Sequence, residues 1–498
     1  MSLVRRVLLA CLATVCFASS LARADLAADV RAVLNDKYLS KAKAGVAIAK
    51  LTDGSDKADI IFASNAKTPL IPASNLKLIT TAAALDRFGA DFKFRTHLLL
   101  KGEDLYLVGD GDPTMGDAEM LKPLGWDVTT IFNIWADELK KKNITSVKNL
   151  FIDDSVFDEQ FLHPNWPIDQ EHKRYVAQVG GINLNANCVD FVIRRTSYGQ
   201  TVEAILNPNT QYISVKNTCL TGDRDAVDLA RVRGTNNVVL RGQTDVSRTE
   251  PFYVTVNDPP MFAATVLGET LASAGITVGV APTRDRSARN RFAKEAEVGG
   301  WVIVGSLETP IGVVLNRANK DSMNLYAESL CKRMGFAATN GQPGSWLSGT
   351  TAMGDFLKSC GVGEDQFHFD DGCGLSKENT ISAESFVRVL AREFAGKNAQ
   401  VFRDSLSVSG ADGTLKDRFR NTPLAGRVFG KSGYVNYVST LSGYVNTTAG
   451  EWYAFSILFN EVPFKTNNTA KELQEKIVNA IEVNAKKSTA SAQSRPAN

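Results

Sequence analysis

The sequence is poor in the residues that most often bind metal ions. Only four histidines occur among its 498 residues, and no C-x-x-C or H-E-x-x-H spacing is present. We therefore expect no metal and no other cofactor. The formal net charge is only +2 and no basic cluster stands out, which argues against a nucleic-acid partner. Beyond the N-terminal segment no apolar run reaches the roughly 18 residues of a membrane span, so membrane association is expected to be peripheral at most.

The N-terminal segment has the three features of a cleavable secretory signal. Residues 1–24 carry two arginines near the start, an apolar core and an Ala-Arg-Ala site before Asp25. In an alternative interpretation Cys11 is the lipidated residue of a lipoprotein signal. That alternative would shorten the apolar core to about four residues, below the usual length. We therefore expect export with cleavage before Asp25.

Cysteine is also scarce. Five of the seven cysteines follow the predicted signal, at positions 188, 219, 331, 360 and 373. In an oxidising compartment they could form two disulfides and leave one thiol. Proximity in the sequence suggests Cys188–Cys219 and Cys331–Cys360, although spacing alone does not determine connectivity.

The exported chain is too long for one ordinary core, and its two ends share a β-rich pattern. The N-terminal end reads as a hairpin followed by a buried helix. The C-terminal end reads as three strands followed by an amphipathic helix. The strands are expected at 44–51, 60–63, 428–435, 438–446 and 451–459, and the helices at 74–88 and 469–486. These elements predict one five-stranded antiparallel sheet that carries a long insertion.

Ser74 and Lys77 open the buried helix in IPASNLKLITTAAALDRFG, residues 71–89. Pro72 favours a helix start near Ser74, and Gly89 favours a stop. Residues three apart lie on one helix face, and the partly positive helix start favours a serine alkoxide and a neutral lysine. The pair therefore suits a nucleophile and its base. A single S-x-x-K is more often an N-cap serine with a surface lysine, and three other copies begin at Ser40, Ser64 and Ser329.

Two further motifs favour the catalytic interpretation of Ser74 and Lys77 over the N-cap interpretation. Ser322-Met323-Asn324 stands on a loop before a helix, and Lys431-Ser432-Gly433 stands on a strand. Each has an ordinary alternative, a helix N-cap for the first and a polar strand with a bulge for the second. The order S-x-x-K, S-x-N, K-[TS]-G, however, is the signature of penicillin-binding proteins and serine β-lactamases.

The resemblance extends over essentially the whole exported chain. The sequence resembles the class C low-molecular-mass penicillin-binding proteins, peptidase family S13, the penicillin-binding protein 4 type of D-alanyl-D-alanine carboxypeptidase/endopeptidase. Besides the three motifs, it shares the stretches GDGDPTM (109–115), NLNANC (183–188), DGCGLSKEN (371–379) and GADGTLKDRF (410–419).

The resemblance implies an α+β fold. Its serine β-lactamase/DD-peptidase-like domain has a five-stranded antiparallel sheet with helices on both faces, expected at 25–92 and 289–486. Two nested inserted domains rich in β-structure are expected, one at 93–182 with 252–288 and one at 183–251. Residues 487–498 are expected to be a disordered tail.

The resemblance also implies a mechanism. Ser74 attacks the carbonyl of the D-alanyl-D-alanine bond while Lys77 takes its proton. The backbone N–H groups of Ser74 and Tyr434 form the oxyanion hole. Ser322 relays a proton to the leaving amine, with Lys431 nearby. Water then hydrolyses the acyl-enzyme.

Other residues would hold the substrate. Asn324 would bind its amide group, and Lys431 and Ser432 would position the terminal carboxylate, with Gly433 permitting close approach. In some family members an aspartate near a Trp-Pro pair binds the free amine of diaminopimelate. Here either Asp169 or Gln170 stands at that position after Trp166-Pro167.

Three positions depart from the family pattern. Ser432 replaces a threonine and keeps the hydroxyl, whereas Tyr434 replaces a small hydroxyl residue and changes the carboxylate site. Cys373 replaces the serine of the DGSG loop.

The function implied is that of a periplasmic, penicillin-sensitive DD-peptidase acting on peptidoglycan stem peptides, with β-lactams as covalent inhibitors. One alternative is a β-lactamase or esterase on the same core. The other is an inactive peptidoglycan-binding module in which the ring of Tyr434 fills the pocket.

Overall fold

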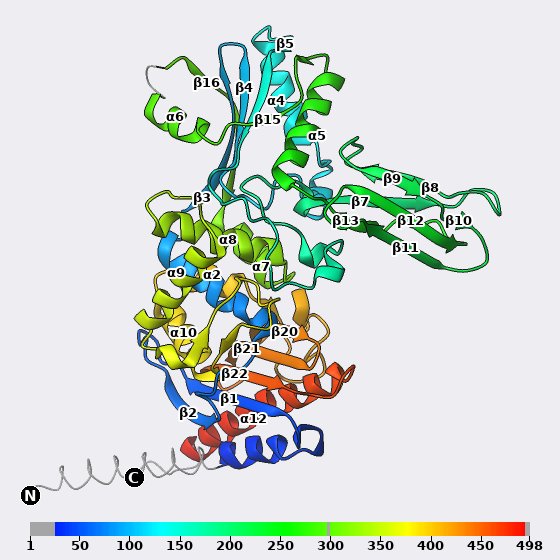
Figure 1. Ribbon diagram of the computed structural model, residues 1–498. Helices are drawn as coiled ribbons and strands as arrows, with labels where there is room; N and C mark the ends of the chain where they lie inside the picture. The colour runs from blue at the N-terminus through cyan, green and yellow to red at the C-terminus, as the bar shows by residue number, and fades with distance from the viewer. Residues whose placement is uncertain (1–24, 296–298, 494–498) are drawn as a thin grey trace, which may run out of the picture. The chain divides into compact units, whose positions relative to one another are not determined.

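The computed structural model describes residues 25–295 and 299–493, so the predicted signal at 1–24 lies outside the described residues. The chain forms two compact units. The terminal unit contains residues 25–90, 315–322 and 351–493. The inserted unit contains Asp91–Val314 and Met323–Thr350 (Figure 1). Among the described residues no helix combines the length and the apolar character that a bilayer crossing requires.

The terminal unit is built on an antiparallel sheet in the order β19-β20-β21-β22-β1-β2. The five expected strands are all present, and the short β19 adds a sixth. β22 pairs with β1, so the two ends of the chain meet in the middle of the sheet. The strands are β1 Lys43–Lys50, β2 Asp59–Ser64, β19 Ser407–Val408, β20 Val428–Val435, β21 Val438–Asn446 and β22 Trp452–Asn460.

Helices cover both faces of this sheet, as expected (Figure 1). The side chains of β21 contact the helices on both faces, since successive side chains of a strand point to opposite faces of the sheet. The Tyr444 hydroxyl donates a hydrogen bond to the Leu390 carbonyl of α10 (2.8 Å), whereas Leu441 packs in one cluster with Ile477 of α12. The first face carries α2 Leu76–Phe88 and α10 Ala383–Ala395, and the second carries α12 Asn467–Gln493 and a helix over 25–34.

Shorter elements connect these layers. They are η1 Lys37–Leu39, η2 Ala73–Asn75, η7 Glu364–Gln366, η8 Gly413–Leu415, β17 Phe367–His368, β18 Thr380–Ile381 and α11 Ala399–Asp404. Two helices start in the inserted unit and end in the terminal unit, α7 Ile311–Asn319 and α9 Trp346–Ser359. Helix α12 is longer than expected, because residues 487–493 of the expected tail are helical.

The inserted unit contains a five-stranded sheet in the order β15-β6-β4-β3-β16. β16 pairs antiparallel with β3 along its full length, so residues 301–310 belong to the insert and not to the catalytic domain expected from residue 289. The elements are β3 Lys93–Lys101, β4 Asp104–Val108, β6 Asn149–Asp153, β15 Thr283–Arg284, β16 Trp301–Pro310, α3 Ala118–Leu121, η3 Lys122–Leu124, α4 Thr130–Lys141, α5 Pro259–Ser273, α6 Ala288–Glu295 and α8 Asn324–Ala338.

The β-rich part of the insert forms two small sheets, β13-β7-β8 and a second one around β12. β13 pairs with β7, so this part continues beyond the expected limit at residue 251. Phe191 and Leu240 share one apolar cluster with Leu107 and Phe262, and the division into two inserted domains stays a prediction. The remaining elements of the inserted unit are η4 Ile168–Gln170, η5 Arg174–Val176, η6 Asn185–Asn187, β7 Cys188–Arg194, β8 Glu203–Asn207, β9 Ser214–Asn217, β10 Leu220–Thr221, β11 Ala226–Arg231, β12 Asn237–Thr244 and β13 Phe252–Thr255. β5 Ser146–Val147 and β14 Thr277–Val278 pair in a separate two-stranded sheet.

The five cysteines in the described part of the chain are all free thiols, so the two suggested disulfides are not formed. Cys188 is fully buried, and its thiol donates to the carbonyl of Ala186 (3.5 Å). Burial raises the pKa of Cys188 to about 12, so this thiol stays protonated at neutral pH.

Glu393 on α10 predicts a pH dependence of stability. Burial, together with the nearby Asp86 carboxylate, raises the pKa of Glu393 to about 8. Between the unfolded value near 4.5 and pH 8 the folded state binds more protons, so the free energy of unfolding falls as the pH rises through this window. We expect Glu393→Gln to stabilise the protein by roughly 2–4 kcal/mol at pH 9 and by little at pH 4, at about 1.4 kcal/mol per pKa unit. Melting temperatures of both proteins at the two pH values test this, and an equal difference at both would contradict it.

Candidate active site

Ser74 and Lys77 are in direct contact at the start of α2. The Lys77 amine donates a hydrogen bond to Ser74 Oγ at 3.0 Å. Lys77 is completely buried, whereas Ser74 is partly exposed. The α-helix begins at Leu76 and not at Ser74 as expected, so Ser74 lies in the preceding 3-10 turn η2, in which Ala73 has a left-handed φ of 46°. The expected contact is thus present in a tighter turn.

A loop at 370–379 holds the first two turns of α2. The Cys373 carbonyl accepts a second hydrogen bond from the Lys77 amine at 2.9 Å. One turn later, the Thr80 hydroxyl donates to the Gly372 carbonyl at 2.6 Å. The backbone carbonyl of residue 373 therefore fixes the amine that faces Ser74, and any side chain at 373 could supply it.

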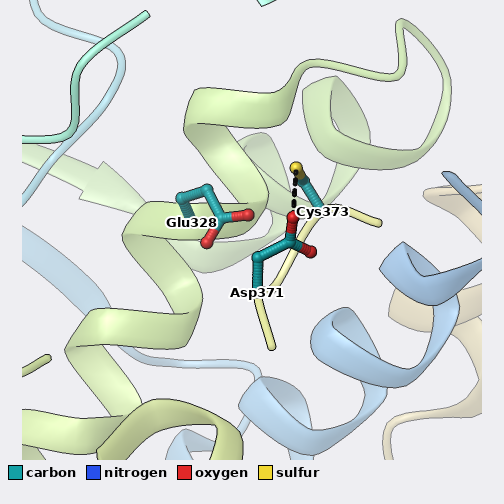
Figure 2. A group of neighbouring side chains, drawn as sticks. All are labelled: Glu328, Asp371 and Cys373. Atoms are coloured by element: carbon teal, nitrogen blue, oxygen red, sulfur yellow. Dashed lines mark hydrogen bonds between the residues drawn. The ribbon is translucent and has the colours of Figure 1, made fainter. Parts of the chain in front are cut away.

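Asp371 organises this loop from a fully buried position. Its carboxylate accepts hydrogen bonds from the backbone N–H groups of Gly374 (2.7 Å) and Ser376 (2.7 Å), and from the Asn379 amide (2.9 Å). Figure 2 shows the Cys373 thiol directed at the same carboxylate, 3.8 Å from Oδ2. Sequence reasoning missed Asp371 as a structural centre. The only signal was an aspartate followed by two nearby glycines and an asparagine.

Two glycines allow the backbone around Ser74 to be enclosed on two sides. A Cβ at Gly374, whose φ is 81°, would lie 1.9 Å from the Ala73 carbonyl oxygen. A Cβ at Gly433 on β20 would lie 2.8 Å from the Pro72 oxygen and 2.9 Å from the Asn75 nitrogen. Side chains at either position would displace the turn, so Gly433 permits the close approach of η2 to β20.

Side chains of β21 attach the turn η2 to the sheet. The Thr440 hydroxyl donates to the Pro72 carbonyl at 2.8 Å. The Asn75 amide donates to the Ser442 hydroxyl at 2.7 Å. These two bonds flank Ser74 in the sequence, so the position of its hydroxyl is fixed relative to β20 and β21.

Lys431 extends from β20 on the same face of the sheet as α2. It is completely buried, and its ammonium donates to the Ser432 carbonyl at 2.7 Å. Burial, with the positive charge of Lys77, holds the pKa of Lys431 well below its usual value, while Asp321 acts in the opposite direction. A lysine in this environment exchanges a proton more readily than one in water.

Ser432 and Tyr434 point to the other face of the strand, since neighbouring residues alternate. Ser432 is half-buried and Tyr434 is 45% exposed. The Tyr434 ring therefore points away from Lys431, which gives no support to the interpretation that it fills the catalytic pocket.

The S-x-N motif spans the boundary between the two units. Ser322 has a left-handed φ of 59° and closes the 315–322 segment of the terminal unit. The neighbouring Lys320 carbonyl accepts from the Thr414 N–H (3.1 Å), which ties this segment to η8. Asn324 begins α8 in the inserted unit, where its amide donates to the Tyr175 carbonyl (2.7 Å).

Asp169, expected to recognise the amine, and Gln170, which would abolish that contact if it stood at the same position, also lie in the inserted unit. Asp169 on η4 is exposed, whereas the side-chain amide oxygen of Gln170 accepts a hydrogen bond from the Tyr175 hydroxyl. Of the two residues, only Asp169 presents a negative charge, and that charge is accessible. Trp166, just before them, is buried against His163 and Trp346.

Comparisons with known proteins identify the family of the chain. The model of the D-Ala-D-Ala carboxypeptidase 3 (S13) family matches residues 26–483. The D-alanyl-D-alanine carboxypeptidase of Actinomadura sp. (strain R39) is 28% identical over 466 residues, covering 88% of this chain and 81% of the relative. The D-alanyl-D-alanine carboxypeptidase DacB of Haemophilus influenzae is 23% identical over 423 residues, covering 80% and 82%.

A solved structure supports the fold. Penicillin binding protein 4 (dacB) from Haemophilus influenzae superposes with a TM-score of 0.71 at 22% sequence identity, covering 91% of this chain and 99% of that chain. The family match reaches across both units and takes in every site residue named above. The chain therefore belongs to the D-Ala-D-Ala carboxypeptidase 3 (S13) family and is a serine-type D-alanyl-D-alanine carboxypeptidase.

Proposed function

We propose that Ser74 is the nucleophile of this enzyme and Lys77 its general base. The 3.0 Å hydrogen bond between Lys77 Nζ and Ser74 Oγ carries the proposal, since a base must reach the proton that it removes. The second bond of Lys77, to the Cys373 carbonyl, supports it by fixing the direction of the amine. Lys77 removes the proton as Ser74 Oγ attacks the carbonyl carbon of the D-alanyl-D-alanine bond.

The tetrahedral oxyanion then collapses to an acyl-enzyme. The backbone N–H groups of Ser74 and Tyr434 hold the oxyanion, and the C–N bond breaks as the leaving amine of D-alanine takes a proton. Ser322 passes on this proton, and Lys431 is the neighbouring amine. The lowered pKa of Lys431 supports its place in proton exchange. Water then attacks the ester and returns the proton to Ser74.

The substrate is the stem peptide of peptidoglycan, and the enzyme acts in the periplasm. Asn324 binds an amide of the peptide, Ser432 and Gly433 guide the C-terminal end along β20, and Asp169 recognises a free amine. β-Lactams mimic the peptide and acylate Ser74. The exposure of the Asp169 carboxylate supports its accessibility to a cationic side chain.

Labelling with a fluorescent penicillin tests the proposal. We expect a stable band on a denaturing gel for the wild-type protein and none for Ser74→Ala, because the acyl bond requires Oγ. Ser40→Ala is a matched control, since Ser40 opens another S-x-x-K pair and is exposed. It should label like the wild type.

Other outcomes separate the alternatives. Labelling that survives in Ser74→Ala would refute Ser74 as the nucleophile. Rapid turnover of penicillin without a band would favour a β-lactamase. The absence of both labelling and D-alanine release from a defined muropeptide would favour the inactive binding module.

A further inference from the structure

Lys332 on α8 belongs to an S-x-x-K pair that the proposed mechanism does not use. Lys332 is completely buried, as Lys77 is, and so is its neighbour Ser329. The Ser329 hydroxyl, however, has no hydrogen-bond partner in the part of the chain that the structure describes. These two side chains thus do not form a bonded pair like the one at the start of α2, and the charge of Lys332 is satisfied elsewhere.

The Lys332 side chain binds the segment that leads to Asp169. It forms an ion pair with the Asp158 carboxylate (2.8 Å) and donates to the Gln160 carbonyl (2.7 Å). Its ammonium also lies 3.8 Å from the centre of the Trp346 ring, a favourable contact for a desolvated cation. Burial lowers the pKa of Lys332, and the Asp158 carboxylate counters that effect. Groups outside α8 therefore hold this buried amine in place.

The Trp346 ring connects Lys332 to the residues just before η4. Trp166 packs edge-to-face against it, with ring centroids 5.7 Å apart, and both rings are buried. The His163 ring lies edge-on against Trp346 at 4.8 Å. The indole N–H of Trp346 donates to the Glu328 carboxylate of α8 (2.7 Å), which fixes the ring on the helix. The turn η4, which carries Asp169, begins two residues after Trp166.

A second attachment to α8 follows Asp169 in the chain. The Asn324 amide donates to the Tyr175 carbonyl (2.7 Å), and the Tyr175 hydroxyl donates to the side-chain amide oxygen of Gln170. The exposed Asp169 thus lies on a span of chain that is attached to one helix on both sides. The two attachment points on α8, Lys332 and Asn324, are about two helical turns apart.

We propose that Lys332 is a positioning residue for amine recognition: it holds the segment that presents the Asp169 carboxylate to the side-chain amine of the stem peptide. The inference rests on the proposed function and adds the residue that keeps this carboxylate in place. Lys332 does not touch the substrate, because it is completely buried. By fixing the chain before η4 it lowers the entropy that amine binding would otherwise cost.

The test compares two stem peptides that end in D-alanyl-D-alanine, one with a free side-chain amine and one acetylated at that amine. We expect Lys332→Met to lower kcat/KM for the free amine by about 10-fold, the lower end of the range for losing a hydrogen bond to a charged group. The loss should appear in KM, because a contact made equally in the ground and transition states affects binding alone. The acetylated peptide should change by less than about twofold.

A double variant separates positioning from general damage. Asp169→Asn alone should lower the preference for the free amine by about 10- to 100-fold. Adding Lys332→Met should cause no further loss, since both changes remove the same interaction. Leu139→Ala, at a buried site on α4 of the same unit, controls for destabilisation and should keep the wild-type preference. If Lys332→Met lacks a wild-type unfolding transition, Asp158→Asn breaks the same link from a partly exposed residue.

Three results would overturn the inference: equal losses for both peptides, an unchanged preference in Lys332→Met and Asp158→Asn, or additive losses in the double variant. Failure of the proposed function gives a different pattern, and the inference falls with it. In that case the wild type hydrolyses neither peptide, or Asp169→Asn keeps the full preference for the free amine.

Discussion

Lys77→Met should fold and lose nearly all acylation by penicillin. We expect the second-order rate to fall by about 10²–10⁴-fold, the usual contribution of a positioned general base. Methionine fills the buried space beside Ser74 but cannot accept its proton. Stopped-flow measurement of acylation, beside a thermal unfolding curve, separates loss of chemistry from loss of structure.

The comparison should include two lysine variants. Lys67→Met removes the exposed lysine of another S-x-x-K pair and should acylate at the wild-type rate. Lys77→Arg keeps the charge but should remain inactive, since a guanidinium does not act as a base at neutral pH. An active Lys77→Arg enzyme would contradict the assignment of Lys77 as the base.

Lys431→Met should change activity and stability in opposite directions. Acylation should fall by about 10²-fold or more, because proton exchange near the leaving group is lost. Stability at pH 7 should rise by roughly 1–4 kcal/mol, as found when a buried charged group is replaced by an apolar one of similar size. Functional sites often carry such a stability cost.

The stability gained in Lys431→Met depends on pH because the pKa of Lys431 is lowered in the folded wild type. The unfolded state keeps the Lys431 proton up to its usual value near 10.5, whereas the folded state releases it at lower pH. Between these two values the unfolded state binds more protons, so wild-type stability rises with pH. The advantage of Lys431→Met in melting temperature should therefore shrink as the pH approaches 10.5. Lys416→Met, at an exposed site, should show neither effect, and a destabilised Lys431→Met would refute the prediction.

The sequence predicted the sheet of the terminal unit well, because its strands are marked locally by apolar runs and turns. It also predicted the contact of Ser74 with Lys77, since a spacing of three residues brings side chains together in both α and 3-10 geometry. The position of β16 was not predictable in this way. Its role depends on pairing with β3, which is some two hundred residues earlier in the chain, and nothing near Trp301 indicates that partner.

The same limit applies to the loop at 370–379. The resemblance identified the loop, but the loop contacts Lys77 through the backbone carbonyl of Cys373. Every residue has such a carbonyl, so the identity of residue 373 does not predict the contact. Asp371 and Lys332 matter through what they face across the fold, and neither belongs to one of the three motifs. The suggested disulfides were wrong because proximity in the sequence does not determine the distance or relative direction of two cysteines in the fold.

The pairing of β1 with β22 has a consequence for how the chain matures. Strand β1, which precedes the nucleophile, pairs with β22 at Trp452–Asn460. The sheet that carries the site therefore depends on a contact of very high sequence separation. Such contacts form late, because a long loop must close before the pairing is rewarded. The inserted unit has its own sheets and core, so it can fold while the chain is still being made. A nascent chain that ends before Trp452 already contains the S-x-x-K segment and the K-S-G strand, yet it lacks the strand that joins them. We therefore expect activity only after the last part of the chain has been made.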